Sequence, residues 1–244
     1  MPKTIVTFDN GNSHPHLGIY QDGIRVALLD PMTFLARYPY QEWKDWTFVV
    51  SHVGKNSELT EKVFKLAKTI TVKKCRKQNR IGDMPIHYQE SLGDDRLVQA
   101  YSIFQNFKKQ NTILIDAGTF ITVDNISETG FNGGYIFPGI TTYLKSYGIG
   151  AHLPVLDAKE IPWDHLELPH STQEAIFLAA QVYLDGLLEQ IKKQFIGSHF
   201  VITGGTGTLI KERLVKLGIT SITLNPYFIH DALYQLSKIS GDKT

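Results

Sequence analysis

Apolar, β-branched runs alternate with polar turns along the first part of the chain, a pattern typical of short strands. The dipeptide Asp22-Gly23 separates two of these runs and predicts a hairpin turn. The segment from 31 to 46 is polar and aromatic and is expected to be a connection. An amphipathic stretch at 57–68 predicts a helix, and the segment 73–93 is expected to be irregular. The strands expected here are 4–9, 16–20, 24–29, 47–53 and 70–72.

The second part of the chain repeats this order of strands followed by alternating helices and strands. It opens with an amphipathic helix at 94–108, whose apolar residues are spaced for one buried stripe. The duplication predicts an α/β protein with two domains, 1–93 and 94–244, each with a mixed sheet, and a cleft between them. The further strands expected are 112–116, 120–124, 134–137, 200–203 and 219–224. The further helices expected are 139–147, 172–195, 228–239 and one that follows Gly204-Gly205 and ends at about 217.

The first strand of each half ends in the same pattern, Asp-x-Gly followed by Asn or Thr. The two copies are Asp9-Asn10-Gly11-Asn12 and Asp116-Ala117-Gly118-Thr119. An aspartate at a strand end can hold Mg²⁺, and the glycine lets backbone N–H groups approach phosphate oxygens. Either copy alone is more typical of an ordinary hairpin turn. Their occurrence at matching places favours two loops that clamp a nucleotide polyphosphate and its metal from both sides.

Composition and charge exclude several classes of protein. The 244 residues are 42% apolar and 20% charged with a net charge of +1, which argues against a general nucleic-acid or membrane-attracted surface. The chain has no apolar run near 18 residues, so no membrane span is expected. Its N-terminal strand is too short for a signal peptide. The single cysteine, Cys75, excludes an intramolecular disulfide framework, and we expect a cytoplasmic protein.

Two isolated features could carry chemistry but have simpler interpretations. Cys75 lies in the basic sequence KKCRK, which could make its thiol reactive, although a solvated basic loop is the more ordinary explanation. His14 and His16 have the spacing of one strand face and could share a metal, but no third ligand type lies nearby in the sequence.

Three further segments have sequences suited to ligand binding. NGGYIFPG at 132–139 begins at two glycines and ends at Pro-Gly, and TGGTG at 203–207 is a glycine-rich turn between a strand and a helix. LGDDRL at 92–97 places acidic residues at the start of a helix. Such residues are often only caps, but beside two phosphate loops one carboxylate could accept the proton of a substrate hydroxyl.

Taken in order, these segments resemble type III pantothenate kinase, a branch of the acetate and sugar kinase, Hsp70 and actin superfamily. The resemblance covers most of the chain. It implies a duplicated actin/Hsp70-like ATPase fold, phosphorylation of pantothenate by ATP as the first step of coenzyme A synthesis, and dependence on Mg²⁺ and on K⁺ or NH4⁺. It also implies a homodimer with the pantothenate pocket at the subunit interface. The matching segments are DNGNS (9–13), SHV (51–53), Tyr88 with LGDDRL (92–97), IDAGTFITVD (115–124), GGYIFPG (133–139), AHLP (151–154), STQEAI (171–176) and ITGG (202–205).

The resemblance also implies roles for individual residues. Asp95 is the expected general base, and Arg96 is expected to hold the pantothenate carboxylate. Asp9 and Asp116 are the expected Mg²⁺ ligands. The expected phosphate-binding positions are Asp9, Gly11, Asn12, Ser13, Gly118, Thr119, Gly204 and Gly205, and the expected pantothenate-binding positions are Tyr88, Gly93, Asp94, Arg96 and Thr172.

Several positions depart from the family pattern. Pro15 follows the first loop and has no N–H to offer. Gln99 stands where Asn is common, and Ala179 and Asp231 stand where Gly is usual. These departures keep open a catalytically weakened or inactive ligand-binding homologue of the same fold. A kinase of the same superfamily that acts on another small molecule, such as a sugar, is a weaker alternative because GDDR and STQEAI match the pantothenate branch.

Overall fold

The computed structural model describes residues 4–11, 14–54, 57–107, 110–150, 153–164 and 167–239. The chain forms two compact units. The first contains residues 1–110, 126–133 and 227–244, and the second contains 111–125 and 134–226. The expected boundary at 93/94 differs from this division because helix α4 (Asp94–Asn106), which was expected to open the second domain, packs against β4 (Thr47–His52) and α8 (Phe228–Ile239) of the first unit.

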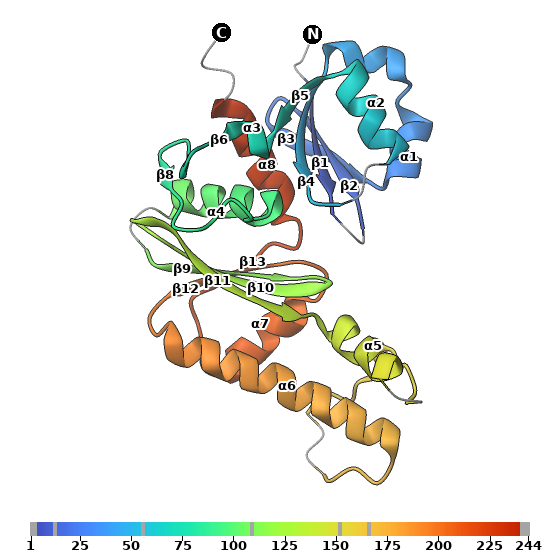
Figure 1. Cartoon of the computed structure of the whole chain (residues 1–244), viewed down its shortest axis with the longest axis vertical. Helices are drawn as coiled ribbons and strands as arrows, with labels where there is room; N and C mark the ends of the chain where they lie inside the picture. Colours follow the sequence, from blue (N-terminus) through green and yellow to red (C-terminus); the bar gives the residue numbers. More distant parts are fainter. Residues whose placement is uncertain are drawn as a thin grey trace. The chain divides into compact units, whose positions relative to one another are not determined.

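The first unit is built on a mixed sheet with the order β3-β2-β1-β4-β5. β1 pairs antiparallel with β2 and parallel with β4, so its carboxyl end lies beside that of β4. Helices α1 and α2 cover one face of the sheet, and α8 lies on the other (Figure 1). The elements not yet given bounds are β1 (Ile5–Asn10), β2 (His16–Gln21), β3 (Ile24–Leu29), β5 (Lys68–Thr71), α1 (Pro31–Arg37), the 3-10 helix η1 (Tyr40–Asp45), α2 (Glu58–Leu66) and α3 (Val72–Cys75).

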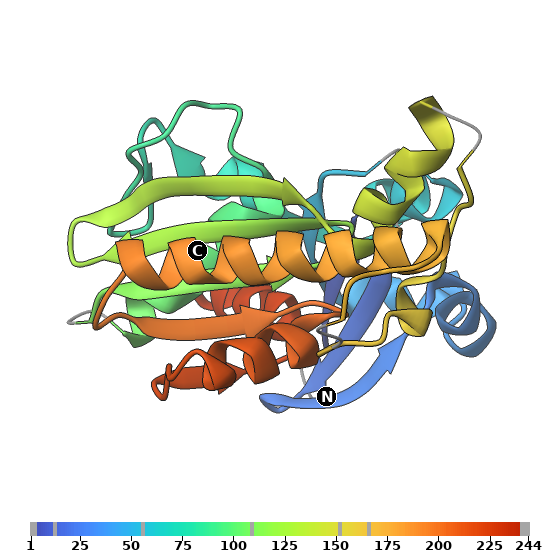
Figure 2. The same ribbon diagram turned by 90° about the horizontal axis from the view of Figure 1, so that it is seen from below.

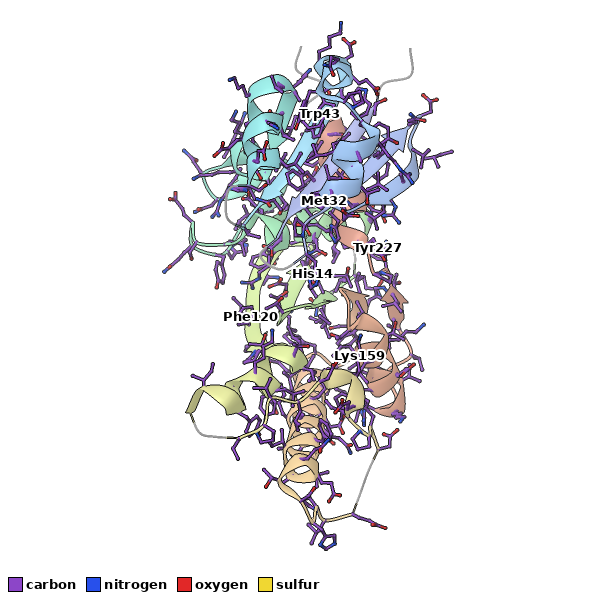
Figure 3. All side chains as sticks on the ribbon, turned by 90° about the vertical axis from the view of Figure 1, so that its right-hand side faces the viewer. His14, Met32, Trp43, Phe120, Lys159 and Tyr227 are labelled. Carbon is purple, nitrogen blue, oxygen red and sulfur yellow. The ribbon has the colours of Figure 1, made fainter. Side chains whose placement is uncertain are left out.

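The segment predicted as a connection between β3 and β4 contains α1 and η1 instead. Asp30 caps α1 by accepting hydrogen bonds from the N–H groups of Met32 and Thr33, and Pro31 occupies the first turn. This Asp-Pro pair was a usable start signal for a helix. The aromatic residues then fill the core on one face of the sheet. Trp43, labelled in Figure 3, is fully buried, and its ring centre lies 5.5 Å from that of Phe34.

The region expected to be irregular before α4 contains short elements of its own. α3 is followed by a small sheet of β6 (Arg76–Lys77), β7 (Arg80–Ile81) and β8 (Met84–Pro85), in that order. Each strand is two residues long, too short for an alternating pattern to be recognised in the sequence.

The second unit has the sheet order β11-β10-β9-β12-β13. Counted within each unit, this is the same strand order as in the first, which confirms the duplicated scheme. The long helix α6 and the shorter α7 pack on one face, with Ile113, Ile115 and Ile202 in the shared core (Figure 2). The elements are β9 (Thr112–Ala117), β10 (Phe120–Ser127), β11 (Gly130–Pro138), α5 (Ile140–Gly150), the 3-10 helix η2 (Ala158–Glu160), α6 (Thr172–Gln194), β12 (His199–Thr203), α7 (Gly207–Lys216) and β13 (Ile222–Leu224).

Candidate active site

The first Asp-x-Gly loop leaves the carboxyl end of β1, where the register sets Asp9 beside Ser51 and Asn10 beside His52 of β4. The side-chain nitrogen Nδ2 of Asn10 lies 2.7 Å from His52 Nδ1. The N–H of Gly54 donates to the Asn10 carbonyl oxygen at 2.8 Å. A Cβ at Gly54 would lie 2.7 Å from that same oxygen, so this close approach requires glycine.

The Asp9 carboxylate lies against Gly11, where an added Cβ would be 3.8 Å from both carboxylate oxygens. Asn12 and Ser13, which were expected to bind phosphate, lie outside the described residues. His16 faces Asp9 in the antiparallel pair of β1 and β2, with Nδ1 3.8 Å from Asp9 Oδ2. Burial lowers the pKa of His16, so its ring is mainly neutral at pH 7.

A second histidine, from α8, was missed by sequence reasoning. His230 is fully buried, and its Nε2 lies 3.1 Å from His16 Nδ1 while its Nδ1 lies 2.7 Å from Thr7 Oγ1. The Thr7 hydroxyl donates to the Gly18 carbonyl, so its oxygen can accept a hydrogen bond from the His230 ring N–H. Because 214 positions separate His16 from His230, no local pattern could have indicated this contact. Among the described residues, no group of three or more His, Cys, Asp or Glu side chains is placed to hold a metal ion.

The second Asp-x-Gly loop leaves β9, where Thr203 at the end of β12 lies beside Asp116. Gly204 follows with a φ of +86°, and an added Cβ there would lie 2.6 Å from Asp116 Oδ1. The N–H and hydroxyl of Thr206 both donate to the Ala117 carbonyl oxygen, at 3.0 and 2.9 Å. The glycine-rich turn at 203–207 is therefore joined to this loop by one backbone and one hydroxyl hydrogen bond from Thr206.

The loop is closed on its other side by the start of α5. The N–H of Gly139 and the hydroxyl of Thr142 donate to the Thr119 carbonyl oxygen, at 3.0 and 2.6 Å. A Cβ at Gly139 would lie 2.2 Å from the Gly118 carbonyl oxygen. The second unit thus gathers its predicted phosphate-binding glycines, Gly118 and Gly204, around Asp116, with Gly205 following Gly204 in the same turn.

Helix α4 begins with the expected acidic pair. Its N-cap, Gly93, makes no side-chain cap hydrogen bond, and Asp95 Oδ1 accepts a hydrogen bond from the Arg96 N–H at 2.8 Å. Burial raises the pKa of Asp95, an effect opposed by that hydrogen bond and by the Arg96 charge. Burial likewise raises the pKa of Asp94, against a hydrogen bond with the His52 backbone. A carboxylate held in this way is a stronger proton acceptor than an exposed one.

Arg96 is 6% exposed and lies among aromatic rings of the first unit. Its guanidinium carbon is 5.5 Å from the ring centre of Tyr88 and 5.8 Å from that of Phe131. The two rings meet edge to face at 5.7 Å. The first turn of α4 thus carries a guanidinium group that makes favourable cation–π contacts with both rings.

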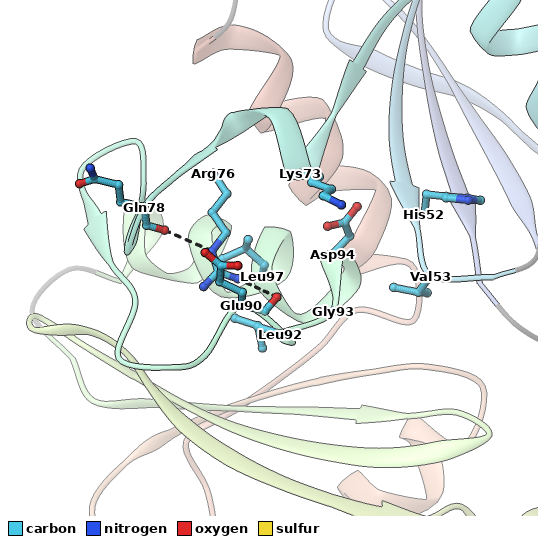
Figure 4. Close-up of a pocket in the computed structure, with 10 residues that line it drawn as sticks. All are labelled: His52, Val53, Lys73, Arg76, Gln78, Glu90, Leu92, Gly93, Asp94 and Leu97. Atoms are coloured by element: carbon cyan, nitrogen blue, oxygen red, sulfur yellow. Dashed lines mark hydrogen bonds between the residues drawn. The ribbon is translucent and has the colours of Figure 1, made fainter.

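A pocket of about 450 Å³ opens at the start of α4 within the first unit (Figure 4). The Lys73 and Asp94 side chains lie next to each other at its edge, and the lining also includes Leu92 and Leu97. Its size and mixed lining suit a small polar molecule with an apolar part. The lining residues are His52, Val53, Lys73, Arg76, Gln78, Glu90, Leu92, Gly93, Asp94 and Leu97.

Thr172, which was expected to bind pantothenate, and Asp231, which stands where glycine is usual in the family, both lie at points where the structure explains their local contacts. Thr172 is the first residue of α6 in the second unit, after the N-cap Ser171, whose hydroxyl accepts a hydrogen bond from the Glu174 N–H. Asp231 accepts hydrogen bonds from Tyr20 at 2.8 Å and Arg25 at 3.3 Å. It therefore connects α8 to β2 and β3.

Comparison with known proteins identifies the family. The family model for type III pantothenate kinase matches residues 5–194. A type III pantothenate kinase from Desulfotalea psychrophila is 34% identical over a match that covers 49% of this chain and 48% of that protein. One from Thermosipho africanus is 27% identical over a match that covers 87% of this chain and 91% of that protein. The chain spans about half the length of the first of these relatives and 59% of one from Flavobacterium johnsoniae, which is 32% identical over 60% of this chain.

Solved structures show the same fold. A conserved Baf family protein from Campylobacter jejuni matches with a TM-score of 0.61 at 20% identity, covering 98% of this chain and 99% of its own. The Lmo2764 protein from Listeria monocytogenes matches with a TM-score of 0.54 at 12% identity, covering 97% and 99%. These similarities confirm the actin/Hsp70-like ATPase fold. In the described part of the chain, no helix is long and apolar enough to cross a membrane. Because the family model covers most of its length, and the two Asp-x-Gly loops and the Gly-Asp-Asp-Arg helix start lie within the match, the chain belongs to the type III pantothenate kinase family.

Proposed function

We propose that this chain transfers the γ-phosphoryl group of ATP to the hydroxyl group of pantothenate, forming 4'-phosphopantothenate for coenzyme A synthesis. The observation that carries the proposal is the half-buried Asp95 carboxyl group at the start of α4, which accepts a hydrogen bond from the Arg96 N–H and whose pKa is raised by burial. The adjoining pocket has room for an acceptor of pantothenate's size. Membership of the family supports pantothenate as that acceptor.

In the proposed reaction, the Asp95 carboxylate takes the proton of the pantothenate hydroxyl while the hydroxyl oxygen bonds to the γ-phosphorus of ATP. The bond between the γ-phosphorus and ADP breaks, and ADP leaves. Arg96, held by Tyr88, binds the pantothenate carboxylate, and Gly93 and Asp94 line the acceptor pocket. Thr172 is a further proposed acceptor contact. Positioning and charge neutralisation are the main sources of catalysis in phosphoryl transfer, so fixed geometry at the start of α4 is the expected protein contribution.

The proposed phosphate-binding residues are those of the two loops, namely Asp9, Gly11, Asn12, Ser13, Gly118, Thr119, Gly204 and Gly205. Asp9 and Asp116 would hold Mg²⁺, and their oxygen donors fit it because Mg²⁺ is usually bound by one or two carboxylates together with substrate phosphates and water. When bound, the ion neutralises charge on the phosphates. The proposals of a K⁺ or NH4⁺ requirement and of a homodimer are supported by the family resemblance.

A coupled assay of ADP release with ATP and pantothenate, with and without K⁺, tests the proposal, and mass spectrometry of the product identifies the acceptor. Asp95→Asn should lower kcat by at least about 100-fold, the size of a lost general base, while ATP still binds. Asp22→Asn, at an exposed aspartate outside the proposed site, is the control and should retain full activity. Equal turnover by wild type and Asp95→Asn would contradict the assigned base, and ligand binding without turnover would support the inactive homologue.

Pro15 bears on nucleotide affinity. It stands between the first loop and β2 and lacks an N–H, so a phosphate there loses one backbone donor. A lost hydrogen bond to a charged group corresponds to about one to two decades in affinity. We therefore propose weak ATP binding, and submicromolar binding by calorimetry would contradict it.

A further inference from the structure

Arg76 makes an unusual set of contacts for a residue on a two-residue strand. Its Nε donates to the Gln78 carbonyl oxygen at 3.3 Å, within its own turn. Its two terminal nitrogens donate to three consecutive carbonyl oxygens further along the chain, those of Tyr88 at 3.3 Å, Gln89 at 3.2 Å and Glu90 at 3.4 Å. The guanidinium group thus ties β6 to the segment 88–90.

The segment held in this way carries a residue of the proposed acceptor site. The Tyr88 ring packs edge to face on Phe131, and the Arg96 guanidinium lies over it at 5.5 Å. Immediately after the segment, the Leu92 N–H donates to the Gln89 carbonyl, and Gly93 then caps α4. The backbone at 88–90 therefore sets the position of the Tyr88 ring and of the chain entering the helix.

We propose that Arg76 is a positioning residue for the acceptor: by binding three successive carbonyl groups it fixes the 88–90 segment, and through Tyr88 it holds the Arg96 guanidinium in place to bind the acceptor. This proposal rests on the proposed function for the identity of the acceptor. The immobilisation of residues 88–90 by Arg76 does not depend on that function.

The chemistry requires arginine at this position. A guanidinium group presents five N–H donors in a rigid plane, so it can reach several carbonyl oxygens at once. A lysine would keep the charge but offer one compact ammonium group that cannot span them. Lys73, Lys74 and Lys77 flank Arg76, so a general need for positive charge would already be met by neighbours.

The test compares Arg76→Lys with Arg80→Lys. Arg80 is an exposed arginine of the same small sheet whose Nη2 donates to the Asp83 carbonyl, so its replacement controls for loss of a guanidinium in this region. Arg76→Lys should raise KM for pantothenate about tenfold, the effect of one or two lost hydrogen bonds. KM for ATP should change less than about twofold, because no phosphate loop is touched. Arg80→Lys should leave both constants unchanged.

A double-mutant cycle shows whether Arg76 acts through Tyr88. Tyr88→Leu should itself raise KM for pantothenate, and adding Arg76→Lys should then change it by less than about twofold, since coupled residues are not additive. Because Arg76 itself lines the pocket at the start of α4, multiplication of the two separate effects would indicate direct contact with the acceptor and would overturn the proposed route through Tyr88. Partial recovery of pantothenate KM in Arg76→Ala on addition of guanidinium ion would support it.

Hydrogen exchange separates this proposal from the proposed function. Arg76→Lys should speed amide exchange in residues 88–92, whereas Arg80→Lys should not, whatever the acceptor is. If the wild-type protein did not phosphorylate pantothenate, the proposed function would be wrong. The exchange measurement would still show whether Arg76 immobilises residues 88–90. Unchanged exchange at 88–92 in Arg76→Lys would overturn the inference.

Discussion

The two Asp-x-Gly loops share a sequence and a place in their sheets, but they are held by different kinds of contact. The first loop is supported by side chains as well as by the backbone hydrogen bond from the Gly54 N–H to the Asn10 carbonyl: the Asn10 side chain contacts His52, and His16 lies beside Asp9. The second is supported largely by the backbone and by hydroxyl groups, with Thr206 and Gly139 donating to loop carbonyls. A repeated motif therefore fixes the direction of the chain after the strand, whereas its surroundings decide what keeps it rigid.

Glycine has the same function beside both loops. Gly54 approaches the carbonyl of Asn10, and Gly139 approaches that of Gly118, each so closely that a Cβ could not be accommodated without a shift. Neither glycine belongs to the repeated Asp-x-Gly pattern itself. The loops therefore depend on glycines that come from other segments of the chain.

The largest effect is expected from neutralising the two aspartates. Asp9→Asn and Asp116→Asn should each lower Mg·ATP-dependent turnover by about 100-fold, because each removes a charge that would hold the metal. Titrations with Mg·ATP and with pantothenate should show weaker nucleotide binding and unchanged pantothenate binding. The exposed Asp22→Asn is the control. Selective loss of pantothenate affinity would contradict the assignment, and an effect at only one aspartate would show that the loops are not equivalent.

The next effect concerns the supporting glycines. Gly139→Ala should destabilise the protein by about 1–3 kcal/mol because its Cβ would lie 2.2 Å from the Gly118 carbonyl oxygen. Gly54→Ala should cost a similar amount in the first unit. Urea unfolding measures both. Gly205→Ala is the control, since its added Cβ would meet no described atom within 4 Å, and a loss as large as that of Gly139→Ala would invalidate the steric explanation.

A smaller effect should distinguish side-chain from backbone support. Asn10→Ala removes the 2.7 Å contact with His52 and should cost about 1 kcal/mol. Thr206→Val should cost about 0.5 kcal/mol, because the Thr206 N–H still donates to the same Ala117 carbonyl after the hydroxyl is lost. Equal losses in denaturant unfolding would argue against a difference between the loops.

The smallest effect is a dependence on pH that originates beside the first loop. Burial holds the pKa of both His16 and His230 below the ordinary 6.5, so the unfolded chain binds protons more readily than the folded one. Their contribution to stability is complete above pH 6.5 and is lost as the pH falls from there through the lower folded-state pKa values. Hydrogen exchange resolved by peptide should show the first unit losing protection as the pH falls from 7.5 to 5.5. His230→Gln should flatten that dependence, and a profile unchanged by this substitution would assign it to other groups.

Much of the fold could be predicted because its elements carry local patterns. The strands β1, β3 and β9 and the helices α4, α6 and α8 lie within a few residues of their expected bounds, since alternating or helical apolar spacing follows directly from burial on one side. The repeated Asp-x-Gly ends likewise predicted two related halves, and the sheets confirm them by having the same strand order. Helix α1 was missed although Asp30-Pro31 marked its start, and the two-residue strands β6 to β8 carried too little pattern to be found.

The sequence by itself determined which residues end the strands, which begin α4, and the family to which the chain belongs. Only the tertiary structure decided that α4 belongs to the first unit, that His230 lies against His16, and that Arg76 binds the carbonyls of residues 88–90. The physical reason is the range of the interactions. Periodicity and capping depend on residues a few positions apart, whereas these contacts join segments whose proximity is fixed only when helices and sheet pack together.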